Sequence, residues 1–109
     1  GHGAEWLSIW LLRLKGYRIL ARRFRVPSGE IDLIARRGRV LVAIEVKARP
    51  AFDTAAEAIS ARQRRRIVRA LEHFRARRPD LGTLDCRFDV VMVAPGRWPR
   101  HLRDAWQAD

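Results

Sequence analysis

The stretch Gly29-Glu30-Ile31-Asp32-Leu33-Ile34-Ala35, followed further on by Ile44-Glu45-Val46-Lys47, decides how this sequence is interpreted. It places four ionisable side chains among branched apolar residues, which β-strands rarely do for stability alone. Residues two apart in a strand share a face. Glu30 and Asp32 therefore lie on one side of the first strand, and Glu45 and Lys47 lie on one side of the second. The chemistry depends on whether these two sides coincide.

The turn at Arg37-Gly38 settles that question, and its sequence is typical of a β-hairpin. A two-residue loop there sets Glu30 opposite Glu45, whereas a four-residue loop sets Asp32 opposite Glu45. Either turn of even length gathers the four charged groups on one face, and a three-residue turn without a bulge would separate them. The opposite face is then filled by Ile31, Leu33, Ile44 and Val46.

Carboxylates crowded in this way repel and raise one another's pKa unless a divalent cation lies between them. Asp and Glu oxygens suit Mg²⁺ or Mn²⁺, and a lysine two residues after a ligand can orient or help deprotonate the water that attacks phosphorus. The chain has 23 Lys and Arg residues, of which only Lys15 and Lys47 are lysines. An amine shifts its pKa when buried and a guanidinium does not, so Lys47 favours a chemical role. The pattern predicts phosphodiester hydrolysis, and a structural ion-pair cluster is the alternative.

The composition predicts one globular domain, residues 1–109, with an anionic partner. Lys and Arg exceed Asp and Glu by 23 to 12, a formal charge of +11, and 48% of the residues are hydrophobic. The lone Cys86, expected to be a buried residue at a strand end, excludes a disulfide scaffold. No apolar run approaches the roughly 20 residues of a membrane span. We therefore expect a cytoplasmic protein, and the spacing of its three histidines does not suit zinc.

The order of the expected elements is α-β-β-β-α-β. Helices are predicted over residues 4–15 and 54–78, the second opened by Thr54 and Glu57 as a capping box. Strands are predicted over residues 17–26, 30–36, 39–48 and 87–94, and residues 98–106 are ambiguous. This order predicts an α/β fold with a mixed central sheet flanked by helices, in which a parallel strand is reached through the long helix.

Both helices carry a further signal. The first is apolar on every side, which predicts burial on several faces or packing on a partner subunit. The second has an inward stripe formed by Ile59, Gln63, Ile67, Ala70 and Phe74. Beside it runs a basic stripe at helical spacing, formed by Arg62, Arg65, Arg66 and Arg69. Residues 57–78 carry eight arginines against two glutamates, which favours contact with a phosphate backbone over a merely solvated face. Arg22, Arg23 and Arg25 extend this basic track.

The spacing of Asp32, thirteen residues and Glu45-Val46-Lys47 resembles the PD-(D/E)XK nucleases of the restriction-endonuclease-like fold. More closely, the chain resembles the YraN family of small bacterial proteins, themselves similar to archaeal Holliday-junction resolvases. The likeness covers almost the whole chain. It includes the blocks at residues 3–5, 15–20, 29–35, 45–49, 57–59, 62–63, 87–91 and 101–106.

The resemblance implies a role for each matching position. Asp32 and Glu45 would hold the metal, Lys47 would serve the attacking water, and Glu5 would complete the site from the first helix. Gln63 matches a polar residue of the following helix, although a buried glutamine often serves only to satisfy a backbone group. Ala43 departs from the pattern, since a bulky apolar residue is expected there.

The resulting hypothesis is a Mg²⁺- or Mn²⁺-dependent endonuclease acting on structured DNA, such as branched junctions. A branched substrate has two strands to cut, so a homodimer is expected. The alternative is a nucleic-acid-binding module that has the same fold and no activity, and a nuclease acting on RNA is a third possibility.

Overall fold

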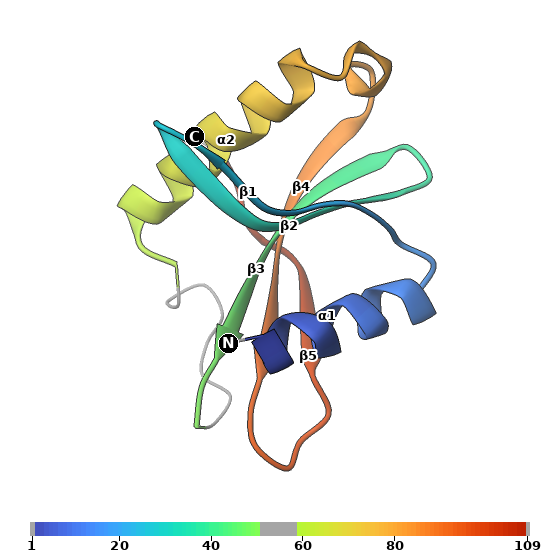
Figure 1. The fold of residues 1–109 in the computed structure, drawn as a ribbon, viewed down its shortest axis with the longest axis vertical. Helices are drawn as coiled ribbons and strands as arrows, with labels where there is room; N and C mark the ends of the chain where they lie inside the picture. Colours follow the sequence, from blue (N-terminus) through green and yellow to red (C-terminus); the bar gives the residue numbers. More distant parts are fainter. Residues whose placement is uncertain (1, 51–58, 109) are drawn as a thin grey trace.

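The protein is described by a computed structural model that places residues 2–50 and 59–108. Figure 1 shows two helices and a five-stranded sheet. The elements in chain order are α1 (His2–Leu14), β1 (Arg18–Val26), β2 (Gly29–Arg37), β3 (Val40–Ala48), α2 (Ala61–Ala76), the 3-10 turn η2 (Pro79–Leu81), β4 (Asp85–Val93) and β5 (Arg100–Trp106). The expected α/β fold with a mixed sheet is confirmed, and the ambiguous C-terminal segment forms a fifth strand.

The strands lie in the order β1-β2-β3-β4-β5. Neighbouring strands are antiparallel except β3 and β4, which are parallel and are connected through α2. The β2–β3 turn consists of Gly38 and Arg39, because Arg37 pairs with Val40. Gly38 has a φ of +59°, a conformation that glycine adopts without steric cost. This register places Asp32 opposite Glu45, the arrangement expected from a four-residue loop, but the loop has two residues and lies one position later than Arg37-Gly38.

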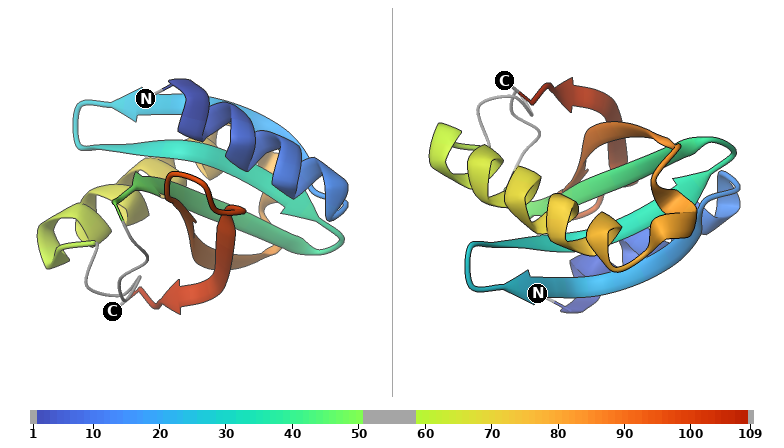
Figure 2. Two further views of the ribbon diagram at one scale, coloured as in Figure 1. Left: turned by 90° about the horizontal axis from the view of Figure 1, so that it is seen from below. Right: turned by 90° about the horizontal axis from the view of Figure 1, so that it is seen from above.

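The two helices cover opposite faces of the sheet, as the two views in Figure 2 show. Ile9 and Leu12 of α1 pack with Leu33 and Ile44 on one face. Against the other face, α2 packs its buried residues Ile67, Ala70, Leu71 and Phe74 on a cluster that includes Ile31, Ile34 and Leu41. The core therefore has two layers, one on each face of the sheet.

The contact of α2 with β2 is very close at Gly29. A Cβ atom built on Gly29 would lie 1.8 Å from the backbone oxygen of Arg66. Only glycine leaves room for the helix backbone at this point. Because α2 also carries Gln63, this contact fixes the height of the helix above the candidate site.

The structure corrects three details of the sequence interpretation. The second helix begins at Ala61 with Ser60 as its N-cap, not at residue 54, and the expected capping box lies outside the described residues. Cys86 is exposed at the start of β4, not buried. Ile31 belongs to the α2 cluster and Leu33 to the α1 cluster, so these two residues do not share a face. Strand β2 twists between them, where its pairing with β3 ends.

Among the described residues, one face of α1 is not covered by the rest of the fold. Its outward side chains Trp6, Leu7, Trp10 and Leu14 are 48–74% exposed. We call these four residues the outer face of α1. In the described part of the chain, no helix is long and apolar enough to cross a membrane.

Candidate active site

Asp32 and Glu45 lie where strands β2 and β3 separate. The last backbone pair of the β2–β3 ladder is Leu33 with Ile44. Beyond it, the two carboxylates accept hydrogen bonds from backbone N–H groups of the opposite strand. The backbone N–H of Asp32 donates to Glu45 Oε2 at 3.0 Å, and the N–H of Val46 donates to Asp32 Oδ2 at 2.8 Å. Each side chain is thus fixed by the opposite strand.

The first turn of α2 supplies a third group. Gln63 donates from Nε2 to Glu45 Oε1 at 3.1 Å, and its own backbone N–H donates to the capping hydroxyl of Ser60 at 3.1 Å. The N-cap therefore sets the start of the helix so that Gln63 faces Glu45. Sequence reasoning placed Gln63 on the inward face and missed Ser60, whose signal is a serine directly before the helical periodicity.

The electrostatics of the pair are those of crowded buried acids. Glu45 is only 4% exposed, and burial together with the neighbouring Asp32 raises its pKa to about 7. Burial also raises the pKa of Asp32. Lys47 opposes both shifts through its positive charge, so its side chain acts electrostatically on both carboxylates. Such a site favours either protonation or a bound cation.

Glu5 lies beside the pair but is held by arginines. It contacts Arg23 at 2.9 Å and Arg22 at 3.8 Å. The backbone of Arg23 has a φ of +50°. Glu5, Arg23, Asp32 and Val46 nevertheless line one small cavity of about 210 Å³. Within residues 2–50 and 59–108, no three Asp, Glu, His or Cys side chains converge as a set of metal ligands. The structure thus brings Asp32 and Glu45 together and leaves Glu5 next to them, engaged elsewhere.

Glu30 lies outside this site. It is exposed and forms an ion pair with Arg25 at 3.4 Å. Its carboxylate is therefore a salt-bridge partner on the surface, not part of the pair formed by Asp32 and Glu45.

Comparison with known proteins adds to this geometry. The family model of "Uncharacterised protein family UPF0102" matches residues 4–93. The chain belongs to UPF0102. This is the family that the sequence resembles under the name YraN, so that resemblance is confirmed.

Curated UPF0102 relatives match over nearly the whole chain. A UPF0102 protein of Parvibaculum lavamentivorans is 58% identical over 107 residues, which is 98% of this chain and 80% of the relative. One from Methylobacterium nodulans is 55% identical and covers 100% of this chain and 84% of the relative. The relatives are named only for the family.

A solved structure confirms the fold of this UPF0102 protein. The Holliday junction resolvase Hjc of Archaeoglobus fulgidus aligns with a TM-score of 0.56 and 23% identity, over 94% of this chain and 76% of that one. The shared fold is a single small domain, which in this chain has a five-stranded mixed sheet.

The basic stripe of the UPF0102 chain lies largely in solvent. Arg62, Arg65 and Arg69 are exposed on α2, and Arg66 is half-buried. Arg22 and Arg23 are exposed on β1 and are the ion-pair partners of Glu5. The stripe on α2 begins beside Gln63, so it leads away from the candidate site along one helix.

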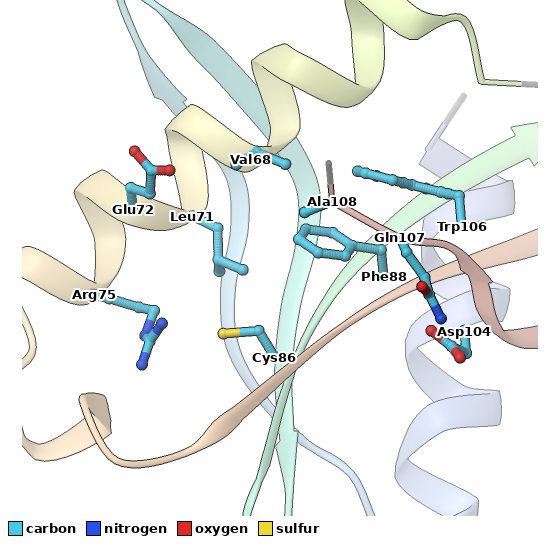
Figure 3. A pocket seen from close by; sticks show the side chains of 10 residues that line it. All are labelled: Val68, Leu71, Glu72, Arg75, Cys86, Phe88, Asp104, Trp106, Gln107 and Ala108. Carbon is cyan, nitrogen blue, oxygen red and sulfur yellow. The ribbon is translucent and has the colours of Figure 1, made fainter.

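A larger cavity, of about 420 Å³, lies between α2, β4 and the C-terminal segment (Figure 3). Its wall includes Leu71 and Arg75 of α2, the exposed thiol of Cys86, Phe88 and Trp106. The rings of Phe88 and Trp106 stack with centroids 4.3 Å apart. The sequence-predicted catalytic residues do not line this cavity, so its shape does not bear on the candidate chemistry.

Proposed function

We propose that this UPF0102 protein is a divalent-metal-dependent endonuclease that hydrolyses phosphodiester bonds in structured DNA. The observation that carries the proposal is the buried pair of Asp32 and Glu45, bonded across two strands, with Lys47 acting on both. The resolvase-like fold supports a nuclease.

The residues present fit Mg²⁺ or Mn²⁺. The donors are carboxylate oxygens, which these hard cations prefer. Each oxygen that accepts a backbone N–H keeps a second lone pair, so the hydrogen bonds orient the groups without exhausting them. The raised pKa of Glu45 shows that two negative charges at this place are costly, and a cation removes that cost.

In this mechanism Asp32 and Glu45 would hold the cation, and Glu5, which lines the same small cavity as Asp32, would be the further carboxylate available to it. When bound, the cation supplies Lewis-acid activation of the phosphodiester and of the attacking water. Gln63 keeps Glu45 in its rotamer through the bond to Oε1. Lys47 orients the water and stabilises negative charge that develops on the phosphate. The arginines of α2 bind the backbone on either side of the cut.

The test is cleavage of labelled four-way junction, duplex and single-stranded DNA with Mg²⁺, Mn²⁺ or EDTA. Asp32→Ala, Glu45→Ala and Lys47→Ala should each lower metal-dependent cleavage by at least about 10²-fold. Glu30→Gln is the matched control, because it removes an exposed carboxylate of the same strand and should retain activity. Full cleavage by Lys47→Ala would refute the mechanism.

The same assay tests the alternatives. Salt-sensitive binding without any metal-dependent product would favour a binding module, for which the engagement of Glu5 by arginines is the supporting observation. Parallel digestion of RNA and DNA separates the third possibility. A cytoplasmic location is part of this proposal.

We further propose that the protein acts as a two-fold dimer. The outer face of α1 supplies an apolar surface that a second copy would cover. Two copies would present two sites to the two strands of a branched substrate. A monomeric mass at micromolar concentration, both with and without DNA, would contradict the dimer.

A further inference from the structure

A second cluster of polar side chains lies on the α1 face of the sheet. Asp89 of β4 is fully buried and accepts a hydrogen bond from the backbone N–H of Asp104 at 2.9 Å. Its other oxygen, Oδ2, lies 2.7 Å from His101 Nε2, and His101 Nδ1 lies 2.5 Å from Lys15 Nζ. The carboxylate requires the proton on Nε2, so Nδ1 is the acceptor that faces the lysine. Burial falls along this chain, from Asp89 at 0% and His101 at 2% to a partly exposed Lys15.

The fold is shaped to hold this arrangement. The register of β4 with β5 shifts between Phe88 and Val90, so β5 bulges opposite Asp89. The bulge contains Asp104, which adopts a φ of +52° and points its N–H at the carboxylate. Bulges of this kind often aim groups at a site. Tyr17 packs edge-on against the His101 ring at 5.7 Å and fixes its orientation.

The surroundings of Lys15 activate its amine. Burial lowers its pKa, and the positive charges of Arg103, Arg37 and Arg87 lower it further, while Asp89 opposes them. Arg37 also donates to the backbone oxygen of Lys15 at 3.2 Å. Asp89 forms its ion pair with Arg87, whose Nε and Nη2 donate to its two oxygens at 2.9 Å, so the Lys15 ammonium is not the counter-ion of this carboxylate. Here an imidazole stands between them, which is how a nucleophile, a base and an orienting acid are arranged.

We propose that Lys15 is a nucleophile that forms an imine with the C1′ aldehyde of an abasic deoxyribose in DNA, with His101 as its base and Asp89 orienting the imidazole. The assignment of DNA rests on the proposed function. The aldehyde follows from the chemistry, because an amine forms imines with carbonyl groups and a DNA strand exposes an aldehyde where a base has been lost. The nearby Arg37 and Arg103 suit the flanking phosphates.

The reaction balances without an oxidant or a reductant. His101 Nδ1 takes a proton from the Lys15 ammonium, and the Nζ lone pair forms a bond to C1′. The imidazolium returns that proton to the departing hydroxyl, so water leaves and the iminium forms. Neutral His101 then takes a proton from C2′, the C–H pair forms a C2′=C3′ bond, and the C3′–O bond breaks with its electron pair on the phosphate. Water hydrolyses the imine, which frees Lys15, and the proton on His101 passes to solvent.

The experiment is borohydride trapping on a labelled duplex with one abasic site, in EDTA. Borohydride reduces the imine to a stable amine, so the wild-type protein should become covalently bound to the strand. Lys15→Arg keeps the charge and should lower trapping at least about 10²-fold. Mass spectrometry of the cross-linked peptide should find the adduct on Lys15 and not on Lys47, which separates the two lysines of the chain. Circular dichroism checks that each variant is folded.

A role for His101 as base has its own readout. His101→Gln should slow trapping and move the pH dependence of its rate to higher pH, a change that a merely structural loss would not produce. Absence of a cross-link with the wild-type chain, or an equal cross-link with Lys15→Arg, would overturn the proposal. EDTA removes the metal-dependent reaction, so the two proposals are tested separately. If trapping fails, the proposed endonuclease activity is not affected, and if metal-dependent cleavage fails, a trapped Lys15 adduct still supports the imine chemistry.

Discussion

Glu45→Gln should make the stability of the protein less dependent on pH. In the folded protein Glu45 titrates at about 7, against an ordinary value of 4.5. Below pH 4.5 both folded and unfolded chains carry the proton, so its stabilising effect is fully present. As the pH rises from 4.5 to 7 the unfolded chain loses the proton while the folded chain retains it, and stability falls.

The size of the effect follows from the same two values. Each tenfold change in an ionisation constant is about 1.4 kcal/mol, so ionised Glu45 costs the folded state about 3 kcal/mol above pH 7. Glutamine avoids this cost and loses about 1 kcal/mol through one mismatched hydrogen bond with Asp32 or Gln63. The variant should therefore be about 1 kcal/mol less stable than the wild type at pH 4 and about 2 kcal/mol more stable at pH 8.

The assay is urea unfolding of both proteins in EDTA at pH 4 and pH 8, followed by circular dichroism. Glu72→Gln, which removes an exposed carboxylate of α2, controls for the change in net charge. A difference between variant and wild type that is the same at both pH values would refute the reasoning, because it would mean that Glu45 is not ionised at a cost.

Four further predictions concern cation binding and three other parts of the molecule. Mn²⁺ at pH 8 should raise the melting temperature of the wild type and not that of Glu45→Gln. At 100 times its dissociation constant the ion should add about 2.7 kcal/mol to the stability of the wild type. Equal shifts in the two proteins would mean that the ion binds elsewhere. Gly29→Ala should destabilise the fold by roughly 1–3 kcal/mol or more in urea unfolding, because its Cβ would meet the α2 backbone, and an unchanged midpoint would show that the contact is loose. Replacing Arg62, Arg65 and Arg69 by Gln should reduce the slope of log affinity against log salt by about 3, measured by fluorescence anisotropy with duplex DNA. An unchanged slope would mean that these arginines do not contact the DNA backbone. Trp10→Glu should shift the sedimentation mass of the protein from dimer to monomer, and a retained dimer would place the interface away from the outer face of α1.

The sequence predicted the fold because the relevant signals are local. Strand alternation, the turn glycine and helical periodicity are encoded in neighbouring residues, and they placed Asp32 across from Glu45 as one of two options. The choice between these options depended on where the turn sits. Gly38 occupies the first turn position, where its positive φ is needed, and this moves the hairpin by one residue.

The remaining features depend on tertiary contacts that no local pattern carries. Glu5 was expected among the metal ligands, but in the fold it lies close to β1 and forms ion pairs with Arg22 and Arg23. Cys86 was expected to be buried, yet it lies where β4 begins and faces an open cavity beside Arg75 of α2. The contacts from Lys15 to His101 and from His101 to Asp89 join residues 86 and 12 positions apart. The pairing of β4 with β5 brings the second pair together, and the turn after α1 brings Lys15 to His101.

The reciprocal bonds between β2 and β3 give the protein two natural spectroscopic reporters. The amides of Asp32 and Val46 donate to carboxylates of the opposite strand. Any event that protonates, rotates or neutralises those carboxylates must change the environment of these two N–H groups directly. Their resonances in a nitrogen-15 correlation spectrum would therefore follow cation or substrate binding residue by residue, without a label placed in the site.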